Sequence, residues 1–316
     1  MTHSRAPRRL AATAVAVSAA LALSACGGGG DPLANNGSGA GSSGSAAPSQ
    51  TIVVGSANFT ESQILAEIYA QALQAKGVQV DKKLNIGSRE TYIPALQDGS
   101  IDLLPEYTGT LLQYIDKNAT ATAPDEVYSA LQKAVPGTLT VLEKSAAEDK
   151  DAIVVTQDTA TKYNAKSIAD LAAHCGEIVF GGPPEFQTRP DGIPGLAKTY
   201  NCNFKSYQSL DAGGPLTVGA LKNGDVQAAD IFTTDASIPA NKFVVLEDPK
   251  SNFAAQNVVP LINKAKASPE VTAALNAVSA KLTTEELTSL NAEAASDTKP
   301  SPETVAKNWL SKQGLG

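Results

Sequence analysis

A pattern of helix end, short apolar strand and aromatic loop occurs twice in the chain, and it constrains the fold more than any other feature. In the first copy, residues 101–104 form an apolar run that Pro105 is expected to end, and a loop with Tyr107 follows. In the second copy, residues 226–229 form the run and Phe232 takes the place of Tyr107. Two similar strand–loop–helix units indicate two similar lobes.

A second pair of segments supports the repeat. Residues 52–55 read as a buried strand followed by Phe59, and residues 178–181 read as another, followed by Phe186 at nearly the same offset. Ligands of open α/β sheets bind at the carboxyl ends of the strands, so these aromatic loops are expected to face a ligand between two lobes. The alternative is that the helix-end pattern before two of the strands is common and matches by chance.

Strands alternate with helical patterns along the folded part, which predicts an α/β fold and not a β-sandwich or a helix bundle. A charged run ends at Asp151, and an apolar strand follows it directly. We therefore expect the first lobe to comprise residues 51–150 and 248–316, and the second lobe residues 151–247.

The N-terminal residues 1–25 are typical of a bacterial lipoprotein signal. Arginines at the start precede a short apolar stretch at residues 10–23, and small residues then precede Cys26. We expect the Cys26 thiol to carry lipid, and the alternative is an ordinary secretory peptide cut nearby. Residues 26–50 are rich in Gly, Ser and Ala, so they are expected to be a disordered tether that keeps the protein near an extracytoplasmic membrane surface.

The charge and the cysteine content indicate which partners and which compartment to expect. The net charge of −7, without a basic cluster after Arg9, argues against nucleic-acid binding. Cys175 and Cys202 are the other cysteines, and an exported chain with one such pair predicts a disulfide. A metal site that also uses His174 is the alternative, but it lacks the usual ligand spacing.

The sequence offers little for catalysis. His174 is the one histidine after the signal segment, and neither a Gly-x-Ser-x-Gly elbow, a phosphate-binding loop nor a dinucleotide fingerprint is present. A binding protein without a cofactor is therefore favoured over an enzyme. The alternative in another class is a hydrolase that uses Asp149 and Asp151.

Several segments resemble one family, the osmoprotectant-binding proteins of ATP-driven importers, which are receptors for glycine betaine, carnitine and choline. The matching segments are Gly-Ser-Ala-Asn-Phe-Thr-Glu at 55–61, Pro-Glu-Tyr-Thr-Gly-Thr at 105–110, Glu-Phe-Gln-Thr-Arg-Pro-Asp-Gly at 185–192 and Thr-Thr-Asp at 233–235. The resemblance implies a two-lobe fold of the periplasmic-binding-protein type II that closes by a hinge. It also implies a permease and its ATPase as partners, and we expect a monomer.

Members of this family hold a quaternary ammonium in a box of tyrosines by cation–π attraction. Tyr107 keeps the first tyrosine, whereas the second, third and fourth fall on Asp151, Phe232 and Gln256. Asp149 matches an acidic neighbour of the box. Ligand-carboxylate contacts fall on Thr110 and Arg189, while Ala57 stands where many relatives have Lys. The expected ligand-binding residues are Asn58, Phe59, Tyr107, Thr108, Thr110, Asp149, Asp151, Phe186, Arg189, Phe232 and Gln256.

The incomplete box leaves two kinds of ligand open, a betaine-type or proline-type osmoprotectant and an aromatic or sulfur-containing zwitterion. We expect Tyr107 and Phe232 to face each other across the cleft, with Asp149 and Asp151 supplying negative potential. Other readings remain for single residues. Tyr107 packs only within its loop in one of them, Phe186 belongs to a core, and Arg189 pairs with Asp191. The sequence assigns no role to Arg89.

Overall fold

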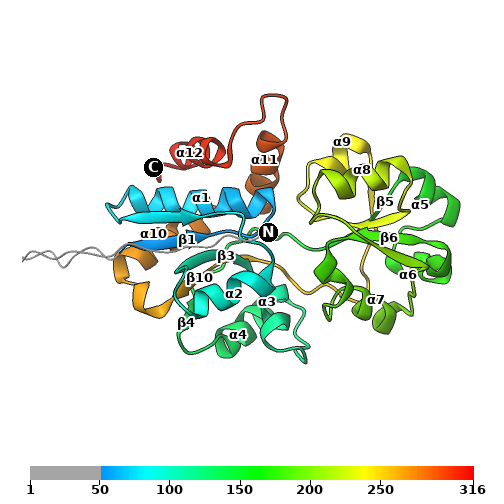
Figure 1. Ribbon diagram of the computed structural model, residues 1–316, viewed down its shortest axis with the longest axis horizontal. Helices are drawn as coiled ribbons and strands as arrows, with labels where there is room; N and C mark the ends of the chain where they lie inside the picture. Colours follow the sequence, from blue (N-terminus) through cyan, green and yellow to red (C-terminus); the bar gives the residue numbers. More distant parts are fainter. Residues whose placement is uncertain (1–50) are drawn as a thin grey trace, which may run out of the picture. The chain divides into compact units, whose positions relative to one another are not determined.

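The computed structural model describes residues 51–316, which form two α/β lobes, each around a five-stranded sheet (Figure 1). The signal segment 1–25, Cys26 and the tether 26–50 lie outside the described residues. Among the helices of residues 51–316, none combines the length and the apolar composition that a membrane span requires.

The sheet of lobe 1 has the strand order β2-β1-β3-β10-β4. The strands are β1 Ile52–Gly55, β2 Val80–Lys83, β3 Leu103–Tyr107, β4 Leu139–Val141 and β10 Val258–Asn263. Strands β1, β2 and β3 are parallel, while β10 is antiparallel to both β3 and β4. The central strand β3 is buried along its whole length, whereas the edge strand β2 is mostly exposed and charged.

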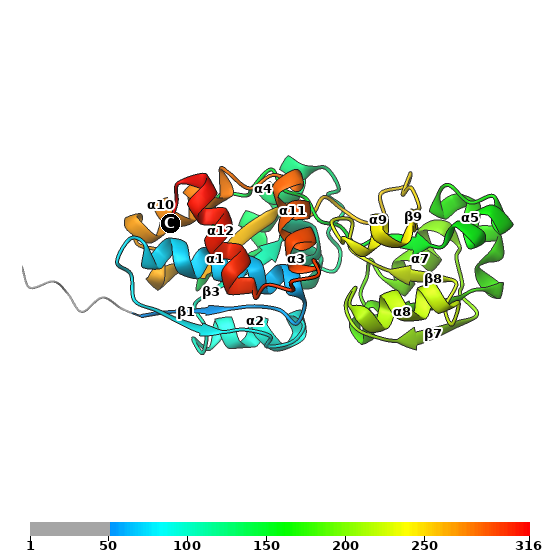
Figure 2. The ribbon, with the colours of Figure 1, turned by 90° about the horizontal axis from the view of Figure 1, so that it is seen from above.

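Helices cover both faces of this sheet. They are α1 Thr60–Gln74, α2 Arg89–Gln97, α3 Thr108–Ile115, α4 Pro124–Ala134, α10 Pro269–Ser279, α11 Thr284–Ala294 and α12 Pro302–Gln313. Apolar side chains of α1, α10, α11 and α12 share one core, and those of α2, α3 and α4 belong to a second core with the sheet between them. Helix α12 packs against α1 and crosses over it in the view from above (Figure 2).

Strand β3 does not end at Pro105, as the sequence pattern predicted, but continues to Tyr107. Pro105 lies directly opposite Pro260 of β10. Two facing prolines have no N–H to exchange, so they fit a non-hydrogen-bonded position of an antiparallel ladder. The expected loop at 107–109 is also absent, because α3 begins at Thr108, immediately after the strand.

The sheet of lobe 2 has the strand order β7-β6-β8-β5-β9. Its strands are β5 Ile153–Val155, β6 Val179–Gly182, β7 Ser206–Ser209, β8 Ala228–Asp230 and β9 Val244–Val245. The helices are α5 Gln157–Tyr163, α6 Ile168–Leu171, η1 Ala172–Glu177, η2 Pro184–Gln187, α7 Ile193–Tyr200, α8 Pro215–Asn223 and α9 Ser237–Asn241, while η3 Lys264–Lys266 follows β10 in lobe 1. Two cores lie on the two faces of the sheet.

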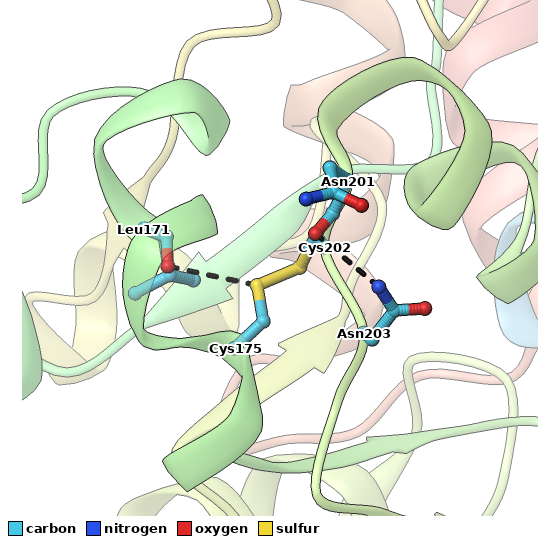
Figure 3. Close-up of a disulfide and its surroundings, with 5 residues drawn as sticks. All are labelled: Leu171, Cys175, Asn201, Cys202 and Asn203. Atoms are coloured by element: carbon cyan, nitrogen blue, oxygen red, sulfur yellow. Dashed lines mark hydrogen bonds between the residues drawn. A yellow bond between two sulfur atoms is a disulfide. The ribbon is translucent and has the colours of Figure 1, made fainter.

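A disulfide joins Cys175 in η1 to Cys202 just after α7 (Figure 3). Both cysteines are buried in the core that contains Phe180 and Phe186. Because Cys175 and Cys202 are joined to each other, neither is free for the metal site considered with His174.

The chain passes from the first sheet to the second between β4 and β5, and it returns between β9 and β10. The two passing segments pair with each other, through an antiparallel bridge between Glu148 and Asn257 and a hydrogen bond from the Asp149 N–H to the Gln256 carbonyl at 3.1 Å. This pairing places Asp149 and Gln256 side by side where the lobes join.

Candidate ligand-binding site

One pocket, with an empty volume of about 530 Å³ that is open to solvent, is lined by residues of both lobes. The lining residues are Ala57, Asn58, Phe59, Ser88, Arg89, Tyr92, Tyr107, Thr110, Asp149, Asp151, Pro183, Glu185, Arg189, Ala212, Phe232 and Gln256. Every residue expected at the site is among them except Thr108 and Phe186.

Three aromatic rings form one wall of the pocket. The Phe59 ring centroid lies 5.0 Å from that of Phe232 and 6.1 Å from that of Tyr107. Tyr107 and Phe232 therefore line the same pocket from different lobes, as expected. Phe59 lies near both rings, and that Tyr107 and Phe232 face each other across the cleft stays a prediction.

The positions of these rings follow from the ends of regular elements. Phe59 is the extended residue just before α1, and Tyr107 is the last residue of β3. Phe232 follows β8 by two residues, at the carboxyl end of that strand. Each ring thus lies at or just beyond the end of a strand, or just before a helix.

Thr108 and Phe186 lie elsewhere, and each has a structural reason. The Thr108 hydroxyl is buried in the first turn of α3, where it donates to the Ala255 carbonyl at 3.1 Å and accepts from the Asn257 N–H at 3.0 Å. Phe186 is buried in the core of lobe 2, where its ring stacks on Phe180 with centroids 5.6 Å apart. Phe186, which the sequence pattern paired with Phe59, is therefore a core residue and not a pocket residue.

Glu61 is a residue that sequence reasoning did not assign to the site. Its Oε1 accepts from the Tyr107 hydroxyl at 2.6 Å, and its Oε2 accepts from the Thr234 hydroxyl at 2.6 Å and from Asn291 Nδ2 at 2.5 Å. Thr234 belongs to lobe 2 and the other residues to lobe 1. This carboxyl therefore fixes the Tyr107 ring and connects the two lobes. Its place in the quoted 55–61 segment was the only signal for it.

Asp149 lies next to Glu61 and accepts from the Thr234 N–H at 3.0 Å and the Thr233 hydroxyl at 3.2 Å. Burial and the neighbouring Glu61 raise the pKa of Asp149 well above its ordinary value, and burial also raises the pKa of Glu61. The raised pKa values of both groups favour a shared proton over two full charges at this pair. That Asp149 and Asp151 supply negative potential to the pocket stays a prediction.

Both arginines of the pocket are held by carboxylates of the protein. Arg89 Nε and Nη2 each lie 2.8 Å from an oxygen of Glu106. Arg189 pairs with Glu90 of the other lobe at 3.2 Å and with Glu185 at 3.9 Å. The alternative pairing of Arg189 with Asp191 is absent from the ion pairs of residues 51–316. Arg89, to which the sequence assigned no role, lines the pocket.

Gln256 holds Thr110, a polar residue that lines the pocket, in position. Its Oε1 accepts from the Thr110 N–H at 2.9 Å, and its Nε2 donates to the Thr110 hydroxyl. Where relatives are expected to carry a tyrosine, this chain thus has an amide that orients Thr110.

The chain has two lobes, each with a mixed sheet, and a pocket lined by aromatic and charged residues of both lobes. These features define a solute-binding protein of the two-lobe type. Residues 50–312 match the sequence model of the family OpuAC, described as the substrate binding domain of the ABC-type glycine betaine transport system, and the chain belongs to this family. It is an extracytoplasmic substrate-binding component of an ABC importer, and the family consists of transport binding proteins and not of enzymes.

Individual members of known function or structure share less than a third of their aligned residues with this chain. The chain is 29% identical over 269 residues to the ergothioneine transport permease/ergothioneine binding protein EgtU of Helicobacter pylori, covering 84% of this chain but only 48% of that protein, about half its length. It is 29% identical over 286 residues to the glycine-betaine-binding protein of Pseudomonas aeruginosa, covering 85% and 90%. A crystal structure of a glycine betaine/carnitine/choline ABC transporter superposes with a TM-score of 0.66 at 26% identity, covering 84% and 99%.

Proposed function

We propose that the protein captures a small betaine, a zwitterion with a quaternary ammonium and a carboxylate, and delivers it to a permease and its ATPase. One observation carries this proposal. The rings of Phe59, Tyr107 and Phe232 line one pocket and come from both lobes. A methylated ammonium has no N–H to donate, so ring faces are its best neighbours, at about 0.5–2 kcal/mol per ring.

The carboxylate end of the ligand has polar neighbours in the same pocket. Arg189 is partly exposed there, and Thr110 presents a hydroxyl that Gln256 orients. Arg189 forms ion pairs with Glu90 and Glu185, so a ligand carboxylate competes with these side chains for the guanidinium.

A second candidate is an aromatic or sulfur-containing zwitterion, and two observations favour it. Asp151 and Gln256 occupy positions where the family resemblance calls for tyrosines, so a purely aromatic box is incomplete. One relative of this chain is named an ergothioneine binding protein, and ergothioneine is a betaine with a sulfur-bearing imidazole ring.

The anchoring and the assembly belong to the same proposal. Cys26 is proposed to carry the lipid, with residues 26–50 as tether, and the binding unit is proposed to act as a monomer. The lobes are proposed to comprise residues 51–150 with 248–316, and residues 151–247. Mass spectrometry of the protein from a membrane fraction tests the lipid, since an unmodified Cys26 thiol would contradict it.

A thermal-shift panel tests the ligand class, because a ligand that binds the folded state raises its stability as RT ln(1 + [L]/Kd). The panel contains glycine betaine, carnitine, choline, proline and ergothioneine. Tyr107→Ala should weaken binding of the active compound by about 1–3 kcal/mol, from lost contact area and cation–π attraction. Tyr163→Ala, a partly exposed tyrosine outside the pocket, is the control and should bind normally. Unchanged binding by Tyr107→Ala would refute the site.

A further inference from the structure

The guanidinium of Arg89 is held in one orientation at the wall of the pocket. Its Nε and Nη2 donate to the two oxygens of Glu106, each at 2.8 Å. Glu106 is fully buried, and it accepts further hydrogen bonds from the Tyr92 hydroxyl at 2.8 Å and from the Tyr107 N–H at 2.9 Å. A planar guanidinium that is fixed through two of its nitrogens also has its third nitrogen fixed in direction.

This third nitrogen, Arg89 Nη1, is left for a partner from outside the protein. Among the hydrogen bonds of residues 51–316, those of the Arg89 side chain use Nε and Nη2 only. Nη1 is not one of the buried polar atoms without a partner, so solvent reaches it, although Arg89 as a whole is only 7% exposed. Because Arg89 lines the pocket, a molecule in the pocket can accept a hydrogen bond from Nη1.

The start of α2 favours an anion at the same place. Arg89 is the first residue of α2, and Ser88 before it also lines the pocket. The Ser88 hydroxyl does not cap the helix, because it donates to the Glu90 carboxylate at 2.6 Å. The first N–H groups of a helix lack partners within the helix and carry partial positive charge. The side chain of Arg89 and the end of its helix therefore present positive charge to one part of the pocket.

Arg89 has fewer competing carboxylates than the other arginine of the pocket. Arg189 pairs with both Glu90 and Glu185 and is 17% exposed. Asp151 lies close enough to Arg89 to interact with it electrostatically, but the ion pairs of the described residues do not include one between them. Burial raises the pKa of Asp151, against the lowering effects of Arg189 and Arg89, and this favours its neutral form. A ligand anion therefore meets less competition at Arg89.

We propose that Arg89 is the residue that makes the receptor specific for ligands with a carboxylate, because its Nη1 donates to the carboxylate of the bound betaine. The inference rests on the proposed function, since it assumes a betaine in the pocket, and it adds Arg89 to Arg189 and Thr110 as a contact of the carboxylate. Choline has the same ammonium group but a hydroxyl in place of the carboxylate. Binding of choline therefore leaves a largely buried cation without its anionic partner, which disfavours this ligand.

Titration calorimetry of the full-length protein with glycine betaine and choline tests the assignment. A hydrogen bond between charged groups predicts that the wild type binds glycine betaine about 10- to 100-fold tighter than choline. Arg89→Lys should weaken glycine betaine binding about tenfold or more and leave choline within about twofold. Lysine keeps a positive charge beside Glu106, but its single nitrogen does not replace a fork that serves Glu106 and the pocket together.

Two further variants separate ligand contact from folding. The double variant Arg89→Gln, Glu106→Gln removes both charges of the pair, so no buried ion is left unpaired, and it should lose the preference for glycine betaine as Arg89→Lys does. Lys82→Gln is the matched control, because Lys82 pairs at 2.8 Å with the buried Glu67 in the same lobe but outside the pocket. It should lower the melting temperature and leave both affinities as in the wild type.

A structural role of Arg89 alone would change the binding of both ligands together. An equal loss for glycine betaine and choline in Arg89→Lys, or no loss for either, would therefore overturn the assignment. Equal affinity of the wild type for the two ligands would overturn it as well. These results would leave the betaine receptor standing, whereas the proposed function itself fails if no betaine binds the wild type.

Discussion

Each lobe buries a carboxyl group that contacts a residue of the pocket, Glu106 beside Arg89 in lobe 1 and Asp230 beside Asp151 in lobe 2, but the two carboxyls are satisfied in different ways. In lobe 1, Glu106 accepts hydrogen bonds from Arg89 Nε and Nη2, from the Tyr92 hydroxyl and from the Tyr107 N–H, all at 2.8–2.9 Å. In lobe 2, Asp230 keeps an oxygen without a partner. The buried carboxyl of Glu106 in lobe 1 therefore has donors for both of its oxygens, whereas the carboxyl of Asp230 in lobe 2 does not.

The lobes also differ in what stabilises them. In lobe 1, α1 packs against all three C-terminal helices, α10, α11 and α12. Lobe 2 has short strands, short helices and the Cys175–Cys202 disulfide. Substitutions that remove one partner of a buried interaction should consequently change the free energy of unfolding by different amounts in the two lobes.

The largest loss is expected for Arg89→Met in lobe 1. This change leaves Glu106 buried without its cation, and breaking a buried ion pair in this way costs about 3–5 kcal/mol. Asp230→Asn in lobe 2 should change the free energy of unfolding by less than about 1 kcal/mol, because burial raises the pKa of Asp230 and so favours the neutral form, which an amide resembles. Urea unfolding of both variants measures the difference. Equal losses would show that the two carboxyl environments are not distinct.

Removal of the disulfide is expected to have the next largest effect. The double variant Cys175→Ser, Cys202→Ser frees a segment with a sequence separation of 27, and closing a loop of this length is worth about 3–4 kcal/mol in the chain-entropy description. Hydrogen exchange should show the loss in β6 and α7 of lobe 2, with β3 and β10 of lobe 1 little changed. Uniform loss of protection in both sheets would show that the disulfide stabilises more than its own lobe.

The features that could be predicted from the sequence are those that depend on residues close to one another in the chain. Alternating strands and helices and the repeated aromatic step at Tyr107 and Phe232 predicted the α/β fold and most of the pocket, because strand ends carry ligand sites in such sheets. These features depend on residues that are close in sequence. They need no knowledge of which side chain meets which.

The missed features depend on partners that are far apart in the chain. Glu61 meets Asn291, and Arg189 meets Glu90, and no local pattern specifies either pair. Phe186 became a core residue because Phe180 and Phe253 surround it. Pro105 stayed within a strand because its partner across the ladder, Pro260, also lacks an N–H.

Asp191 gives the stability of lobe 2 a dependence on pH. Burial and then Asp151 raise its pKa from 3.8 to about 6, against the opposing effect of Arg189 and Arg89. Since the folded state binds this proton more tightly, the stabilisation is complete below about pH 4 and is lost as the pH rises through about 6. Asp191→Asn should therefore be more stable than wild type at pH 7, by about 2–3 kcal/mol, and this advantage should vanish by about pH 4. Melting temperatures of both proteins across this range measure it, and parallel curves would contradict it.

The smallest effect is expected where the two lobes meet, at the pair between Glu90 and Arg189. Glu90 is half exposed, so Glu90→Gln should cost no more than about 1 kcal/mol of stability. The same change releases the Arg189 guanidinium from one of its two carboxylates, and a ligand carboxylate should then bind about two- to fivefold tighter, since a partly exposed charge contact is worth only a few tenths of a kcal/mol to about 1 kcal/mol. Choline, which has the ammonium but no carboxylate, should bind as before. Calorimetry with glycine betaine and choline separates these outcomes. A parallel gain for both ligands would mean that Glu90 restrains the lobes themselves and not the arginine.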